Sequence, residues 1–160
     1  KPHKEKYHAL YWQIAKSAAA QSVAVNRQVG AAIVTTTGIV AIGWNGTPAG
    51  LDNSCEYSVI GAGNVPRLKT KPEVIHAEIN AINKLVKSKL TTVGSILFTT
   101  TAPCMNCAKS IETAGISHVY YIYDFHGNVG IDFLISMGVI TEKYLKNKPS
   151  DINLEGITHE

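Results

Sequence analysis

The sequence is poor in cysteine and in long apolar runs. Three of its 160 residues are Cys, and so small and odd a number argues against a disulfide framework and favours a reducing compartment. No apolar run approaches the roughly 20 residues that cross a bilayer, and the charged residues 1–5 contain no signal-peptide core. We therefore expect a cytoplasmic protein, or one of the host cytoplasm if the source is viral, with no membrane partner.

Charge is also scarce, because only 17% of the residues are charged and the formal net charge is +3. No run of Lys or Arg marks a track for a long nucleic acid, so we expect no such partner, whereas a small anionic substrate fits this balance. What the sequence does contain is a hydrophobic fraction of 45%. Together with the length, this fraction predicts a single domain over residues 1–160 with a substantial core.

Apolar periodicity predicts four helices and five strands. Helices are expected over residues 7–20, 73–87, 104–114 and 129–137, and strands over residues 29–35, 39–43, 95–100, 118–123 and 139–144. This order implies the α/β class, with a mixed five-stranded sheet covered by helices on both faces in three α/β/α layers.

Two segments depart from this pattern. Residues 44–72 are rich in Gly and Pro, which predicts a long irregular insert loop with a short helix or turn near residues 55–59. A loop of this length inside a compact domain usually serves function. Residues 145–160 are mostly polar and are expected to form a tail.

Three metal-ligating side chains and one carboxylate occur in two short motifs. His76 and Glu78 are separated by a single alanine. Cys104 and Cys107 enclose two residues and follow Pro103. One imidazole and two thiolates leave the fourth position of a tetrahedral Zn²⁺ open, as in catalytic sites. Either motif alone would be weak, since a lone C-x-x-C equally suits a redox pair or half of a structural zinc site, but their conjunction predicts one catalytic zinc per chain.

The predicted helices bring the two motifs together. We expect His76 and Cys104 each to lie at the start of a helix, with Pro103 at the first helical position. Two helix N-termini would then converge on one point. Their positive ends favour thiolates over thiols. Zinc lowers the pKa of a bound water to about 7, and Glu78 lies near the metal without pointing along the ligand direction. We expect Glu78 to be the catalytic proton carrier, a role that a raised pKa would suit.

The two zinc motifs resemble those of the cytidine and deoxycytidylate deaminase superfamily. Residues 27–31 (RQVGA) and 43–50 (GWNGTPAG) resemble the deoxycytidylate (dCMP) deaminases in particular, and the similarity runs over about residues 5–140. The resemblance implies a cytidine-deaminase-like fold. It also implies hydrolysis of dCMP to dUMP and ammonia.

The resemblance implies further roles at matching positions. Asn45 is similar to the family's ligand for the sugar hydroxyl, and Arg27 is a candidate for the phosphate, which a guanidinium can bind bidentately. The backbone of Ala77 and Cys104 would meet the pyrimidine edge, and His126 the phosphate or that edge. Residues 123–126 (YDFH) depart from the family's Asp-x-Tyr-His, so no phosphate-binding Tyr is carried over. Arg27 as a surface cation, Asn45 as a turn residue and His126 as a loop residue stay open alternatives.

Regulation is also implied by the resemblance. Many of these deaminases are homo-hexamers activated by dCTP and inhibited by dTTP, with Mg²⁺ accompanying the triphosphate. The expected effector residues are Asn45, Gly46, Lys84 and Lys87. The two lysines would equally suit an ordinary solvated helix face.

Other functions remain compatible with the motifs. The substrate could be cytidine, dCTP or a tRNA adenosine, although the last would favour a more basic surface. A non-catalytic zinc or nucleotide-binding module would need a fourth ligand, such as Cys55, to close the metal site. Some phage members of the family that this chain resembles hold a second, structural zinc with Cys and His of the insert. This insert contains no His, so the resemblance implies no second zinc here, and Cys55 is interpreted as a free thiol.

Overall fold

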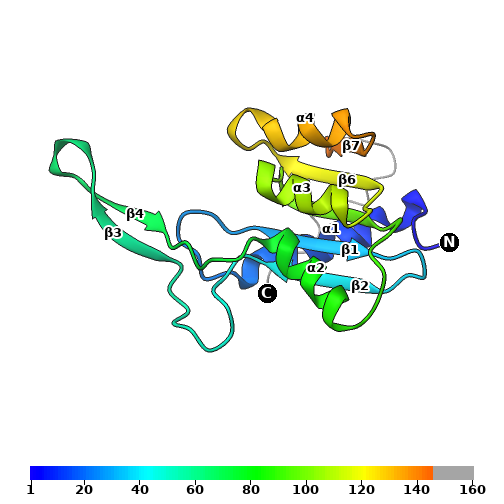
Figure 1. Ribbon diagram of the computed structural model, residues 1–160, viewed down its shortest axis with the longest axis horizontal. Coiled ribbons are helices and arrows are strands. Elements are labelled where there is room, and N and C mark those ends of the chain that lie inside the picture. The colour runs from blue at the N-terminus through cyan, green and yellow to red at the C-terminus, as the bar shows by residue number, and fades with distance from the viewer. Residues whose placement is uncertain (146–160) are drawn as a thin grey trace.

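The computed structural model describes residues 1–145 (Figure 1), so the predicted tail lies, beyond its first residue, outside the described part. The helices are α1 (His8–Gln21), α2 (Ala77–Lys87), α3 (Met105–Thr113) and α4 (Val129–Ser136), with 3-10 turns at Glu5–Tyr7, Ala62–Asn64 and His126–Asn128. The strands are β1 (Gly30–Val34), β2 (Val40–Trp44), β3 (Glu56–Ile60), β4 (Pro66–Thr70), β5 (Ile96–Thr101), β6 (His118–Tyr123) and β7 (Ile140–Lys143). Among these helices, none is both long enough and apolar enough to cross a bilayer.

A five-stranded sheet in the order β2-β1-β5-β6-β7 forms the centre of the fold. Strand β1 is antiparallel to β2 and to β5, whereas β5, β6 and β7 run parallel. The predicted mixed sheet is therefore confirmed. The largest shift in a predicted boundary is at α2, which begins at Ala77 rather than at residue 73. The preceding residues are not helical, because residues 71–74 form a turn and Ile75 exchanges two backbone hydrogen bonds with Gly46.

Helix α1 covers one face of the sheet, and α2, α3 and α4 cover the other (Figure 1), as the predicted three layers require. On the α1 face, Tyr11 and Trp12 pack on Phe98 of β5, with the Trp12 and Phe98 ring centroids 5.1 Å apart. Successive residues of a strand point to opposite faces, so the fully buried β1 supplies Ala32 and Val34 to this cluster.

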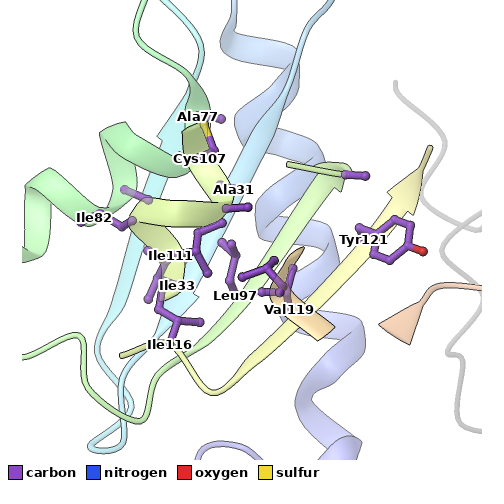
Figure 2. Close-up of a cluster of buried hydrophobic side chains, with 14 of the residues drawn as sticks. Ala31, Ile33, Ala77, Ile82, Leu97, Cys107, Ile111, Ile116, Val119 and Tyr121 are labelled. Atoms are coloured by element: carbon purple, nitrogen blue, oxygen red, sulfur yellow. The ribbon is translucent and has the colours of Figure 1, made fainter. Parts of the chain in front are cut away.

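The second core cluster lies between the sheet and the helices that carry the metal motifs. Figure 2 shows Ile33 and Leu97 of the sheet beside Ile111 of α3. Ala77 and Cys107, from the first turns of α2 and α3, belong to the same buried cluster. Both metal motifs are thus attached directly to a packed interior, which holds functional side chains more firmly than a free loop would.

Two glycines allow helices to approach this region closely. A Cβ at Gly43 of β2 would collide with the Ala77 carbonyl at the start of α2. A Cβ at Gly130 of α4 would collide with the carbonyl of Pro103, just before Cys104. Each metal motif therefore has a glycine packed against its backbone, where any larger side chain would displace it.

The prediction that residues 44–72 form an irregular loop is wrong for the middle of this segment. The prediction of a helix or turn near residues 55–59 is also wrong. Strands β3 and β4 form a separate two-stranded antiparallel sheet that projects from the body as a hairpin (Figure 1). Most of its residues are exposed, so the strands lack the alternation of buried apolar residues that reveals a strand in a sequence. Pro66 begins β4, a position where a missing N–H is tolerated.

Candidate active site

Three metal-ligating side chains converge where α2 and α3 begin. His76 is the N-cap residue of α2, Cys104 is the N-cap residue of α3, and Cys107 lies in the first turn of α3. The His76 Nδ1 atom lies 3.2 Å from Cys107 Sγ and 3.6 Å from Cys104 Sγ. The predicted convergence of two helix starts is confirmed. Pro103, however, precedes the cap instead of occupying the first helical position, because the Cys104 sulfur caps the helix by accepting from Cys107 N–H.

This donor set fits zinc. The three ligand atoms lie within 4.8 Å of one another. Tetrahedral zinc with ordinary Zn–S and Zn–N bonds separates a sulfur from a nitrogen by about 3.5 Å, close to both separations found here. In the described part of the chain, Cys55 does not belong to the metal-ligating group. Its thiol donates instead to the Asn53 carbonyl at 3.5 Å, so the structure offers no support for Cys55 as a closing fourth ligand.

The two thiols differ in acidity because they share a hydrogen bond. Hydrogen bonds from the Cys107 thiol and from the His76 ring lower the pKa of Cys104 to about 3. The same pairing, together with burial, raises the pKa of Cys107. The Cys104 thiolate in turn raises the pKa of His76. A divalent cation takes the place of protons in such a group, which is why metal binding to cysteine sites releases them.

Glu78 lies beside this group in the first turn of α2, with 4% of its surface exposed. Burial raises the pKa of its carboxyl group, a shift that suits the predicted role of proton carrier. The Thr99 hydroxyl lies 3.3 Å from Glu78 Oε1 and 2.9 Å from the Thr101 carbonyl oxygen. Because the hydroxyl proton can go to Thr101, the Thr99 oxygen can accept from a protonated Glu78.

A cavity of about 380 Å³ opens onto these residues, within the range typical of small-molecule sites. The four residues predicted from the sequence to bind substrate all line it: Arg27, Asn45, Ala77 and His126. The structure therefore brings them together with Glu78 and with two of the candidate metal ligands, His76 and Cys104. The base of the β3–β4 hairpin closes another part of the wall.

Arg27 and His126 both contact Phe125, a residue for which the sequence predicted no role. The Arg27 guanidinium lies 4.8 Å from the centroid of the Phe125 ring, and the His126 ring stands edge-on to Phe125 with centroids 4.1 Å apart. Asn128 holds this loop, because its Oδ1 accepts from Phe125 N–H at 2.9 Å. Its Nδ2 donates to Asp124 at 2.7 Å. One side of the cavity thus presents a cation and an imidazole on an aromatic support.

Asn45 braces the neighbouring loop from within the cavity. Its Oδ1 accepts from Val29 N–H at 2.9 Å, and its Nδ2 donates to the Arg27 carbonyl at 2.7 Å. A side-chain amide has a further lone pair and a further proton. Asn45 can therefore hold the loop and still offer one donor and one acceptor to a ligand.

The four predicted effector residues do not form one site. Asn45 lines the main cavity, and Gly46 pairs with Ile75. Lys84 and Lys87 line a separate groove of about 440 Å³ between α2 and β2. In this groove the Lys84 ammonium donates to the Ile42 carbonyl and lies 5.0 Å from the Trp44 ring centroid.

The chain is similar in sequence to known deoxycytidylate deaminases. The family model "Cytidine and deoxycytidylate deaminase zinc-binding region" matches residues 5–123. The chain is 27% identical to the deoxycytidylate deaminase of Enterobacteria phage T4, over 91% of this chain and 93% of that protein. It is 37% identical to human deoxycytidylate deaminase, over 71% of this chain and 63% of the human protein.

A solved structure of a dCMP deaminase is also similar to this chain in fold. The dCMP deaminase of cyanophage S-TIM5, in complex with dCMP and dUMP, superposes with a TM-score of 0.78 at 38% identity. The match covers 88% of this chain and 98% of the cyanophage chain. At this identity and coverage, the architecture described above matches the fold of the cyanophage enzyme.

Proposed function

The chain belongs to the cytidine and deoxycytidylate deaminase family, and we propose that it hydrolyses dCMP to dUMP and ammonia with one catalytic zinc. The observation that carries this proposal is one cavity lined by a buried glutamate, an arginine and two members of the His-Cys-Cys group, His76 and Cys104. The complex of the cyanophage relative with dCMP and dUMP supports the choice of substrate and product.

In the proposed reaction, His76, Cys104 and Cys107 hold the zinc ion. When bound there, zinc would act as a Lewis acid and make water nucleophilic at neutral pH. Glu78 accepts a proton from the attacking water and delivers it to the ring nitrogen next to the amine-bearing carbon. The same carboxyl group then takes the remaining proton of the added hydroxyl and delivers it to the amine nitrogen, whose bond to the ring carbon breaks as ammonia leaves. The Ala77 backbone, in the cavity wall beside Glu78, is proposed to orient the pyrimidine edge.

The part of the cavity lined by Arg27, Asn45 and His126 is proposed to bind the sugar and the phosphate. The Arg27 guanidinium would hold the phosphate bidentately, with His126 beside it. The remaining donor and acceptor of Asn45 would meet the sugar hydroxyl. This division of roles follows the distribution of charge, since the cation and the imidazole lie on the Phe125 side of the cavity.

A substrate panel with an Arg27→Ala variant tests this assignment. Turnover is measured for dCMP, dCTP, cytidine and an adenosine stem-loop, and we expect dCMP to be preferred. Loss of a charge-assisted pair typically costs 1.5–3 kcal/mol, so Arg27→Ala should raise KM for dCMP by roughly 10–100-fold with little change in kcat. Arg67→Ala, which removes the other arginine of the chain from the hairpin, is the matched control. Equal turnover of dCMP and cytidine would contradict phosphate recognition.

We also propose regulation by triphosphates in a homo-oligomer, a hexamer by resemblance. Lys84 and Lys87 would meet a triphosphate with its Mg²⁺ in the groove between α2 and β2, and Asn45 and Gly46 lie where β2 leads to the cavity. Since α2 begins at the catalytic motif, a ligand near its other end could alter Glu78.

The regulatory proposal predicts opposite effects of two nucleotides. In the presence of Mg²⁺, dCTP should activate dCMP turnover and dTTP should inhibit it, and Lys87→Ala should weaken both responses because a phosphate contact is lost. Initial rates across effector concentrations, with sedimentation velocity for the oligomeric state, provide the measurement. Rates that stay flat with both nucleotides would remove this proposal and leave the chemistry of the cavity unaffected.

A further inference from the structure

Glu56 occupies an unusual position for a charged side chain. It is the first residue of β3, and only 9% of its surface is exposed. Its Oε1 accepts two hydrogen bonds, from Val25 N–H at 2.8 Å and from Asn26 N–H at 3.1 Å. A carboxylate withdrawn from water needs such partners, and bonds between backbone N–H groups and a charged acceptor are among the strong ones.

These two amides belong to the loop that carries Arg27. Between α1 and β1 the chain is irregular, so its backbone groups must find partners elsewhere. Asn45 binds the loop at and after Arg27, and Glu56 binds it immediately before. A third contact ties the same loop to the hairpin, because Asn26 Nδ2 donates to the Leu68 carbonyl of β4 at 3.1 Å.

The hairpin therefore contributes to the site although it projects from the body. In the described structure its strands pair only with each other, and a two-stranded sheet alone is marginally stable in water. Bonds between the base of the hairpin and the Arg27 loop order both segments together. Glu56 and its cross-strand partner Thr70 also line the cavity, so this contact lies within reach of a bound substrate.

We propose that Glu56 is a positioning residue that fixes the Arg27 loop and thereby sets the affinity for the substrate's phosphate. The proposal rests on the phosphate role given to Arg27 above. Glu56 acts through Arg27 and takes no part in the proton transfers. Without its carboxylate, the two amides at the start of the loop lose their acceptor, and the guanidinium is no longer held over the cavity.

A double-mutant cycle with dCMP as substrate tests the coupling. Misplacement of a binding group by about 1 Å can cost up to about 100-fold, so Glu56→Ala should raise KM about 10-fold or more while kcat stays within about threefold. Glu56→Gln retains a carbonyl acceptor and should keep KM within about threefold of the wild-type value. In an Arg27→Ala background, Glu56→Ala should add no further increase in KM. The exposed Glu73 provides the control variant, Glu73→Ala.

The outcomes separate this inference from the function on which it rests. A wild-type protein that does not turn over dCMP, or an Arg27→Ala variant with unchanged KM, would overturn the proposed function. Suppose instead that the wild type turns over dCMP and that Arg27→Ala raises KM as expected. The role of Glu56 alone would then be overturned if the effects of the two substitutions were fully additive. It would also be overturned if Glu56→Ala lowered kcat by as large a factor as it raised KM. Should Glu56→Ala fail to fold, Glu56→Asp takes its place, because the shorter side chain withdraws its oxygen from both amides.

Discussion

Glu78→Gln is expected to reduce dCMP turnover by about 10⁴-fold or more while zinc stays bound. Positioned acid–base catalysis is worth about 10²–10⁴ for a proton transfer, and here one carboxyl group is proposed to serve successive transfers. The glutamine amide has nearly the same shape, so it fits the buried position beside Thr99. It cannot carry a proton between water and substrate. The measurement is kcat/KM for dCMP together with zinc content by elemental analysis.

The control for this variant is Glu73→Gln, which changes an exposed glutamate just outside the α2 motif and should leave both readouts unchanged. Near-normal turnover by Glu78→Gln would refute the proton-carrier role. If zinc were lost along with activity, Glu78 would instead be a residue that maintains the metal site.

Removal of zinc is expected to abolish turnover and also to destabilise the fold. The ligands lie at the starts of α2 and α3, so one cation links two helices. A ligand present at a thousand times its dissociation constant stabilises a protein by about 4 kcal/mol. For a domain of this size, that corresponds to a fall in Tm of roughly 8–16 °C on removal. Treatment with a chelator, followed by re-addition of Zn²⁺ or of Mg²⁺, should restore turnover and Tm with Zn²⁺ alone.

Two cysteine substitutions make the same test genetically. Cys104→Ser should reproduce the effects of chelation, because it removes a sulfur ligand while keeping a residue that can cap α3. Cys55→Ser, which changes a buried thiol outside the metal group, should keep zinc at one equivalent. Full turnover in protein that elemental analysis finds free of transition metals would contradict the zinc mechanism.

The residues proposed to bind the metal and to carry protons could be named from the sequence because their signal is local. His76 and Glu78 stand at a helix start, and the spacing of Cys104 and Cys107 places both on one turn. Residue type and short spacing suffice for such an inference. The layers of the fold were predictable for a similar reason, since Ile33, like the rest of β1, lies in a continuous apolar run with a clear strand signal.

The hairpin and the residues that act through it could not be predicted in this way. Strands β3 and β4 are mostly exposed, so their side chains carry no periodic apolar pattern. Glu56 lies in the stretch predicted as a short helix or turn within the insert, and nothing there marked it as functional. Its buried contact with the amides of Val25 and Asn26 exists only because the chain returns to that loop.

The sequence alone determined the chemistry available to this protein: an imidazole, two thiolates and a carboxylate whose types and spacing suit zinc and proton transfer. Only the tertiary structure decided what faces that chemistry. Arg27, Phe125 and His126 reach the cavity from segments far apart in the chain, and their separations depend on how the elements pack. Ligand identity is a property of individual side chains, whereas the shape and charge of a binding cavity are properties of the packed whole.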